Sequence, residues 1–441
     1  MHAPTPTWTR RALLKAGGVA LLSFGAGPSF LARAAAAGAP GNRKKTLVAI
    51  FQRGAMDGLM AVPPLGENGG ERLARLRPRL AMPTAGSSRA SAGNPLDSEQ
   101  AIDLGVGFGL HPAFAPLAPL FREGRLGIVH AVGSPDPTRS HFDAQDYMEA
   151  GTPGRKGTPS GWLDRALAAG PMAPGAPSPF RAVALTPSLP RSLYGEVPAL
   201  AIADLADFRL ASPDAAIPLD SAGGANAGEG FEALYAATSE RLLRSTGAET
   251  FEAVERLRSL GVCRYLPAAG ADYPQGPLGR ALSQIAQLIK ADVGLEVAFA
   301  ESDGWDNHVR QGTTQGGFAR AARELGAAIA AFWTDLEERQ SEVVLTTMTE
   351  FGRTAAENGS GGTDHGHGSC LFVLGERIAG GAVHGRFPGV APEALWEGRD
   401  LAVTTDFRSV FAELAAGHLG VARPAELFPG WSGDRLKLFR A

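Results

Sequence analysis

The run Lys45-Thr-Leu-Val-Ala-Ile-Phe51 decides the fold class of this 441-residue chain. Its apolar residues follow one another without a polar interruption, and Gly54 comes soon after them. A strand that is apolar on both faces is typical of a parallel sheet covered by helices on both sides. The run therefore predicts a buried strand within an α/β fold.

Outward from this run, strand and helix patterns alternate along the chain. Further strands are predicted at 126–132, 294–300 and 343–348, with short edge strands at 182–185 and 199–203. Helical spacing occupies 111–122, 141–150, 230–260, 279–289 and 317–339, and 79–94 has a loop composition. Strands separated by helices favour a layered α/β/α fold with a central, mostly parallel sheet.

The N-terminal residues have the pattern of an export signal. A twin-arginine segment, Thr9-Arg-Arg-Ala-Leu-Leu-Lys15, leads into a modest apolar segment and then small residues up to Ala37. We expect residues 1–37 to be a twin-arginine signal peptide, and 38–441 to form one α/β domain with long loop insertions. This predicts a periplasmic or secreted protein, with the twin-arginine export machinery as a partner. No later run has the apolar length of a membrane helix, so no membrane span is expected in the mature chain.

Composition excludes some classes of function. The 42 basic and 45 acidic residues nearly balance, which argues against a nucleic-acid partner. The chain has no Gly-x-Ser-x-Gly elbow, no Gly-x-Gly-x-x-Gly fingerprint and no Gly-x-x-x-x-Gly-Lys loop, which disfavours several hydrolase and nucleotide-binding families. Its two cysteines, Cys263 and Cys370, are compatible with one disulfide or with two thiols.

Polar clusters follow the predicted strands, where ligand sites of α/β sheets lie. Carboxylates next to imidazoles, in loops loosened by glycine, are suited to a divalent cation such as zinc or manganese. The candidate metal ligands are Asp57, Asp303, Asp306, His308, Glu350, Asp364, His365 and His367. Asp57 before Gly58 is also a turn signal, and Asp303 with Asp306 also fits a polar turn that caps a helix. The isolated histidines, His111, His130 and His384, are expected to be structural.

Several motifs together resemble those of the exported DUF1501 family. They are Asp57-Gly-Leu59, Ser140-His-Phe-Asp-Ala-Gln145, Gly304-Trp-Asp-Asn-His308, Glu350-Phe-Gly-Arg-Thr354 and Gly362-Thr-Asp-His-Gly-His-Gly368. That family is grouped with the alkaline phosphatase and sulfatase superfamily, so the resemblance implies an alkaline phosphatase-like fold with a metal site at the carboxyl edge of its sheet. It also implies a nucleophile at Ser140, with Thr138 as the alternative.

The resemblance further implies an exported metal-dependent hydrolase of phosphate or sulfate esters, acting on a small-molecule or glycan ester. Substrate oxygens would pair with Arg53, Arg139 or Arg353, and His141 or His367 would protonate the leaving group. The alternative is a non-catalytic exported binding or cell-envelope protein that keeps the fold.

The chain departs from the superfamily pattern at Glu350-Phe351, where relatives usually carry an adjacent Asp-His pair. Either Asp364-His365 supplies that pair from the next loop, or the site holds one metal where relatives hold two.

Overall fold

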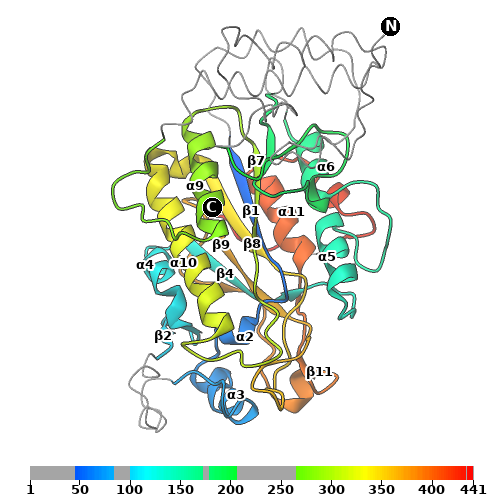
Figure 1. Ribbon diagram of the computed structural model, residues 1–441. Coiled ribbons are helices and arrows are strands. Elements are labelled where there is room, and N and C mark those ends of the chain that lie inside the picture. Colours follow the sequence, from blue (N-terminus) through cyan, green and yellow to red (C-terminus); the bar gives the residue numbers. More distant parts are fainter. Residues whose placement is uncertain (1–44, 84–99, 172–177, 206–264, 434, 441) are drawn as a thin grey trace, which may run out of the picture.

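The computed structural model describes residues 45–83, 100–171, 178–205, 265–433 and 435–440, and a sheet runs through its centre (Figure 1). Within these residues the sheet has nine strands. In spatial order they are β10 (Val383–His384), β4 (Leu126–Gly133), β9 (Ser369–Leu374), β8 (Val343–Met348), β1 (Thr46–Gln52), β7 (Val297–Ser302), β5 (Ala182–Ala184) and β6 (Leu200–Ala201), with β13 (Thr405–Asp406) beside β4. Only β9 runs antiparallel to its neighbours, β4 and β8. The predicted α/β fold with a mostly parallel sheet is confirmed.

Strand β1 lies near the middle of the sheet and is buried on both faces, as its sequence predicts. Side chains on a strand alternate between the two faces. Val48 and Ile50 accordingly join one hydrophobic core, whereas Leu47, Ala49 and Phe51 join the other.

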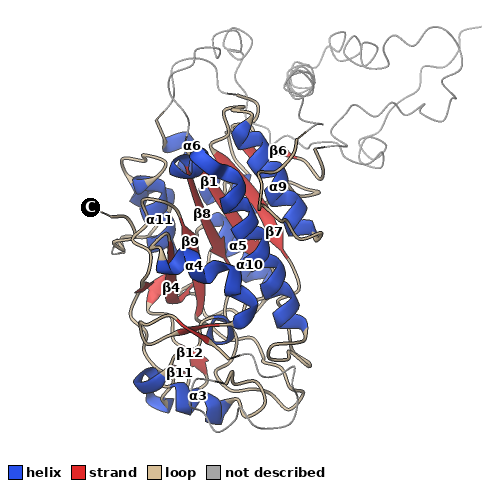
Figure 2. Ribbon diagram, turned by 90° about the vertical axis from the view of Figure 1, so that its left-hand side faces the viewer, coloured by secondary structure: helices blue, strands red, loops and turns tan. Residues whose placement is uncertain are grey.

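Helices cover both faces of the sheet: Figure 1 shows them on either side of the strands, and Figure 2 looks onto the sheet through one of these helical layers. On the Val48 face lie α4 (Ala118–Arg122), α9 (Pro277–Lys290) and α10 (Gly317–Leu336). On the Phe51 face lie α5 (His141–Ala150), α6 (Trp162–Ala169) and α11 (Phe407–Gly417). The smaller elements are α2 (Gly58–Ala61), α3 (Gly70–Leu76), β2 (Ile102–Asp103), β3 (Gly109–Leu110), β11 (Leu395–Trp396) and β12 (Asp400–Leu401).

Two predicted helices differ from the expected form. The helix predicted at 111–122 starts as a 3-10 helix, Pro112–Leu117, because Pro116 lies inside it and cannot donate a backbone hydrogen bond. The helix predicted at 317–339 ends at Leu336, where Glu337 takes a positive φ of 49°. The signal peptide, the helix predicted at 230–260, residues 84–94 of the predicted loop, and Cys263 lie outside the described residues. Cys370 is a buried free thiol.

The carboxyl ends of β1, β4, β7 and β8 meet at one edge of the sheet, which is the lower edge in Figure 1. Because β9 is antiparallel, it begins at this edge instead of ending there. The loop after β8 is thus also the loop before β9, so four loops converge here, and all the candidate ligands come from them. No helix in the described part of the chain is both long and apolar enough to span a membrane.

Candidate metal centre

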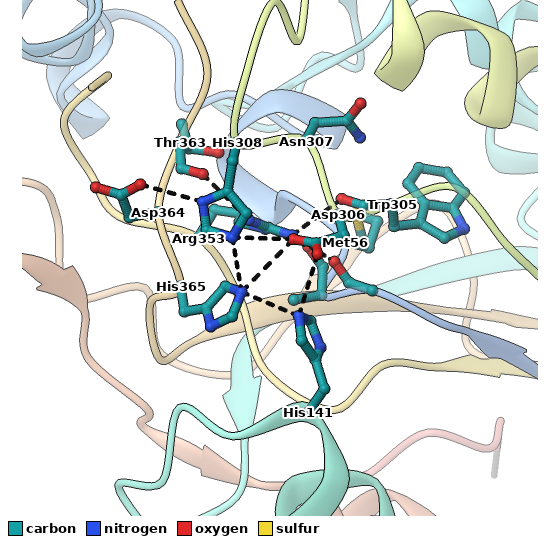
Figure 3. A network of polar contacts seen from close by, with 12 residues as sticks. Met56, His141, Trp305, Asp306, Asn307, His308, Arg353, Thr363, Asp364 and His365 are labelled. Carbon is teal, nitrogen blue, oxygen red and sulfur yellow. Dashed lines mark hydrogen bonds and ion pairs between the residues drawn. The ribbon is translucent and has the colours of Figure 1, made fainter. Parts of the chain in front are cut away.

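Three side chains from separate loops converge at the carboxyl edge of the sheet (Figure 3). His141 is the first residue of α5, Asp306 follows β7, and His365 precedes β9. Their nearest ligand atoms all lie within 4.8 Å of one another. The Nε2 atoms of His141 and His365 are 2.9 Å apart, and oxygens of Asp306 lie 3.6 Å and 3.5 Å from them. This arrangement is the only group of three or more metal-ligating side chains in the described residues.

His308 borders this triad. Its Nε2 atom lies 2.8 Å from Nε2 of His365 and 3.1 Å from Oδ1 of Asp306. It does not belong to the group whose ligand atoms are all mutually close. His308 is thus a further nitrogen donor beside the triad.

In His141, His308 and His365, the Nδ1 atom contacts an oxygen acceptor. Nδ1 of His141 is 2.8 Å from Glu350, Nδ1 of His308 is 3.1 Å from Asp364, and Nδ1 of His365 is 2.8 Å from the Arg139 carbonyl. Since carboxylates and carbonyls only accept, each Nδ1 donates a proton to its oxygen partner, and each Nε2 is directed toward the centre. Imidazole nitrogens this close to one another can share a proton or a cation between them. Metal-bound histidines have this same outer support.

The charges at the centre favour a cation. Burial alone would raise the pKa of Asp306, but its hydrogen bond and charge contact with Arg353 outweigh this and lower the pKa below its usual range. Burial likewise opposes ionisation of Glu350, yet the hydrogen bonds from His141 and Gln145 leave its pKa lowered. The hydrogen bond to Glu350 raises the pKa of His141, whereas burial lowers that of His365. Two ionised carboxylates and a neutral His365 are therefore present near neutral pH.

Arg353 connects the loops of the site. Its guanidinium group contacts Asp306 Oδ1 at 2.5 Å and donates to the carbonyls of Gly54 at 2.6 Å, Ala55 at 2.9 Å and Thr363 at 3.1 Å. The side chain is almost fully buried. One side chain thus ties together the loops after β1, β7 and β8.

The family described as "Protein of unknown function (DUF1501)" matches residues 125–428, more than half of the chain. This chain belongs to the DUF1501 family. No curated protein and no solved structure matches it. The DUF1501 match includes the triad and His308, whereas Asp57 precedes it.

The Asp57 carboxylate forms its hydrogen bonds and its ion pair with residues outside the triad. Its carboxylate pairs with Arg77 at 2.8 Å and 3.1 Å and accepts from Gln311 at 2.8 Å. It also caps α2 by accepting from the Met60 N–H, which fits the turn signal in the sequence. Asp57 and Arg77 are both buried, so this ion pair is already complete without a metal.

The other predicted ligands of this DUF1501 chain fall into two groups. Glu350 and Asp364 contact histidines of the centre and so support it from outside. Asp303 is exposed and His367 stacks on Trp396, with ring centroids 5.3 Å apart, and neither belongs to the triad.

The predicted catalytic residues lie at the start of α5. Ser140 is exposed and caps the helix by accepting from the Asp143 N–H, and Thr138 accepts from the Ser140 N–H. The carbonyl of Arg139 contacts His365, and the next residue but one, His141, joins the triad. Ser140 therefore lies in sequence between two residues that touch the centre.

Sequence reasoning missed two supporting residues of the DUF1501 site. Gln145 donates to Glu350 at 2.9 Å, and Arg77 neutralises Asp57. Gln145 falls one helical turn after His141, so its spacing on α5 was an available signal. His141, which with His367 is one of the two predicted proton donors to the leaving group, has its Nε2 atom in the triad. The isolated histidines are structural as expected, since His111, His130 and His384 each contact a backbone carbonyl.

Proposed function

We propose that this protein is an exported metal-dependent hydrolase of phosphate or sulfate esters, with an alkaline phosphatase-like active site. The observation that carries the proposal is the convergence of two imidazole nitrogens and a carboxylate, each imidazole being held from behind by an oxygen acceptor. A site at the carboxyl edge of a mostly parallel sheet supports it, because ligands of such sheets bind there.

His141, Asp306 and His365 would hold one divalent cation, with His308 beside them. Three protein ligands leave a position open, which is typical of catalytic zinc sites and differs from the closed ligand sets of structural zinc sites. The mixed nitrogen and oxygen donors also suit manganese. When bound, the cation would lower the pKa of a coordinated hydroxyl and polarise an ester oxygen.

Ser140 is the proposed nucleophile, with Thr138 as the alternative. Ser140 stands at the N-terminus of α5, where the helix dipole stabilises negative charge on its hydroxyl oxygen. Its Oγ would bond to the phosphorus or sulfur atom as the bond to the alcohol oxygen breaks, and the alcohol takes up a proton. Water would then hydrolyse the ester on Ser140 and restore the hydroxyl.

Metal content is the first test of the proposal. Elemental mass spectrometry of the mature protein should find a near-stoichiometric divalent metal that is lost in His365→Ala. His384→Ala is the matched control, because the His384 ring contacts the carbonyl of Ala379 and no residue of the triad, so the metal should stay in place. A wild-type protein that takes up no metal on reconstitution would rule out this centre.

Ester hydrolysis separates the enzyme from the alternative, a non-catalytic exported binding protein. Metal-loaded wild type should hydrolyse aryl phosphate or sulfate esters, and Ser140→Ala should abolish turnover while the metal remains bound. If Thr138→Ala abolishes turnover instead, the nucleophile is Thr138. A metal-loaded protein without hydrolysis of any such ester supports the binding protein.

A further inference from the structure

We infer that the ester group accepted at this centre carries a single negative charge, as in a sulfate monoester or a phosphodiester, and is not a phosphate monoester dianion. The inference rests on the proposed function for its metal and deepens it by naming the substrate class. It follows from the pairing of the arginines around the centre.

Arg353 contacts the triad directly, but it is buried and already committed to other partners. It contacts Asp306 and backbone carbonyls of three loops, and its side chain is only 1% exposed. A dianion could recruit it only by breaking this buried network.

Arg53 follows β1 and reaches the centre through Gln145, which contacts Glu350. Its guanidinium group lies 2.7 Å from Glu149 and 2.7 Å from Glu301. One positive charge is thus shared by two carboxylates, so this cluster is negative overall.

Arg139, whose backbone carbonyl contacts His365, is likewise paired with two carboxylates. Its guanidinium group lies 2.8 Å from Glu397 and 2.7 Å from Asp400. Asp400 is also 3.2 Å from Arg399, so the two arginines and the two carboxylates compensate one another. Neither Arg53 nor Arg139 offers an unpaired positive charge to a substrate.

The centre itself has no positive charge to spare for a dianion. A divalent cation and Arg353 stand against the carboxylates of Asp306, Glu350 and Asp364, so these charges sum to about zero. One negative charge on the ester makes the centre anionic, and a second one adds further repulsion, because the cluster around Arg53 is itself negative. Phosphate monoesters carry that second charge at neutral pH, because their second pKa is about 6, whereas sulfate monoesters and phosphodiesters do not.

Binding to the metal-loaded protein tests the charge rule independently of catalysis. Calorimetry should find that diphenyl phosphate, a monoanion, binds about tenfold or more tightly than phenyl phosphate, a dianion, near pH 8. Tighter binding of phenyl phosphate would overturn the inference, whether or not the protein is a hydrolase. If the preference holds but no ester is turned over, the charge rule stands and the proposed hydrolase fails.

The second test measures turnover of three substrates that share the same leaving group, 4-nitrophenolate. We expect kcat/KM for 4-nitrophenyl sulfate or bis(4-nitrophenyl) phosphate to exceed that for 4-nitrophenyl phosphate by about tenfold or more. A monoester rate equal to or above both others would contradict the inference.

Three variants test the cause of this charge preference. Glu301→Gln removes one carboxylate from Arg53 and should improve phenyl phosphate binding several-fold without affecting diphenyl phosphate. Glu426→Gln is the matched control, because Glu426 pairs with Arg423 on an exposed 3-10 helix and should change neither affinity. Arg310, an exposed residue in the loop after β7, should also be dispensable. A loss of phenyl phosphate binding confined to Arg310→Gln would show a free cation at the centre and overturn the inference.

Discussion

Oε1 of Glu350 lies 2.8 Å from Nδ1 of His141, so a fully buried carboxylate orients an imidazole of the candidate metal centre. Glu350 supports a candidate ligand from behind and also accepts from the Gly54 N–H.

Glu350→Gln should weaken metal binding by about 10–100-fold, because the amide cannot stabilise the protonated Nδ1 of His141 as the carboxylate does. Competition with a chromophoric chelator measures the affinity. Glu376→Gln, at a partly exposed carboxylate 3.4 Å from Arg125, is the control. Equal affinities for Glu350→Gln and wild type would show that this contact does not support the metal.

Arg353→Met should destabilise the metal-free protein by roughly 3–5 kcal/mol, since it leaves Asp306 and several buried carbonyls without their donor. Urea unfolding of metal-free protein measures the loss without any contribution from metal binding. Arg79→Met removes an ion pair whose arginine is 56% exposed and should cost at most about 1 kcal/mol. A similar unfolding midpoint for both variants would refute a structural role for Arg353.

Gly366→Ala should impair the centre because Gly366 lies directly after His365 in a crowded place. An added Cβ would meet the backbone of Arg353 and would lie 2.7 Å from the Thr354 nitrogen. We expect a loss of metal affinity and of roughly 1–3 kcal/mol of stability. Gly359→Ala, in the same loop but with no atom within 4 Å of the new Cβ, should match wild type in both measurements. Full metal occupancy in Gly366→Ala would mean that the loop relaxes freely.

The free energy of unfolding should decrease as the pH is lowered from about 6.5 to about 4. Burial lowers the pKa of His111, His130 and His418 from 6.5 to about 4 in the folded chain. In that window the unfolded chain binds protons that the native chain does not, so stability is full above pH 6.5 and declines as the pH falls. Urea unfolding of metal-free protein across the window measures the slope. His418→Gln keeps a donor for the Thr46 carbonyl and should make the slope of unfolding free energy against pH shallower. An unchanged slope would refute the contribution of His418 to this pH dependence.

Much of the fold follows from local sequence patterns, whereas the site depends on contacts between residues that are far apart in the sequence. The buried run at β1 and the helix at 141–150 need only their own apolar pattern and a terminal Gly151, and both formed as predicted. The ion pair of Asp57 with Arg77 has no such local signal, because only the tertiary fold brings the two together.

Strand direction was the other missing information. His365 lies at the far end of the long loop after β8, shortly before β9, and the antiparallel direction of β9 means that this strand begins at the edge where the site lies. The apolar run from Cys370 to Leu374 has the composition of a strand, but composition does not state which way a strand runs. The two histidines and the carboxylate were therefore predictable as candidates, but not as one triad.

Export should depend on the paired arginines. Replacing Arg10 and Arg11 by lysine should retain the precursor in the cytoplasm, because the proposed twin-arginine signal requires both guanidinium groups. Fractionation and immunoblotting compare this variant with Arg33→Lys, a conservative change further along the same segment. Unchanged export of the double variant would point to a different route.

The dispersal of the triad along the chain has a consequence for biosynthesis. The span from His141 to His365 exceeds two hundred residues, and β9, which follows the last ligand, is inserted between β8 and the much earlier β4. A nascent chain that stops before His365 has the first two ligands but not the third. The cation would thus bind only after synthesis and folding are complete. If the protein is exported in its folded state, the cytoplasm would determine which metal it carries.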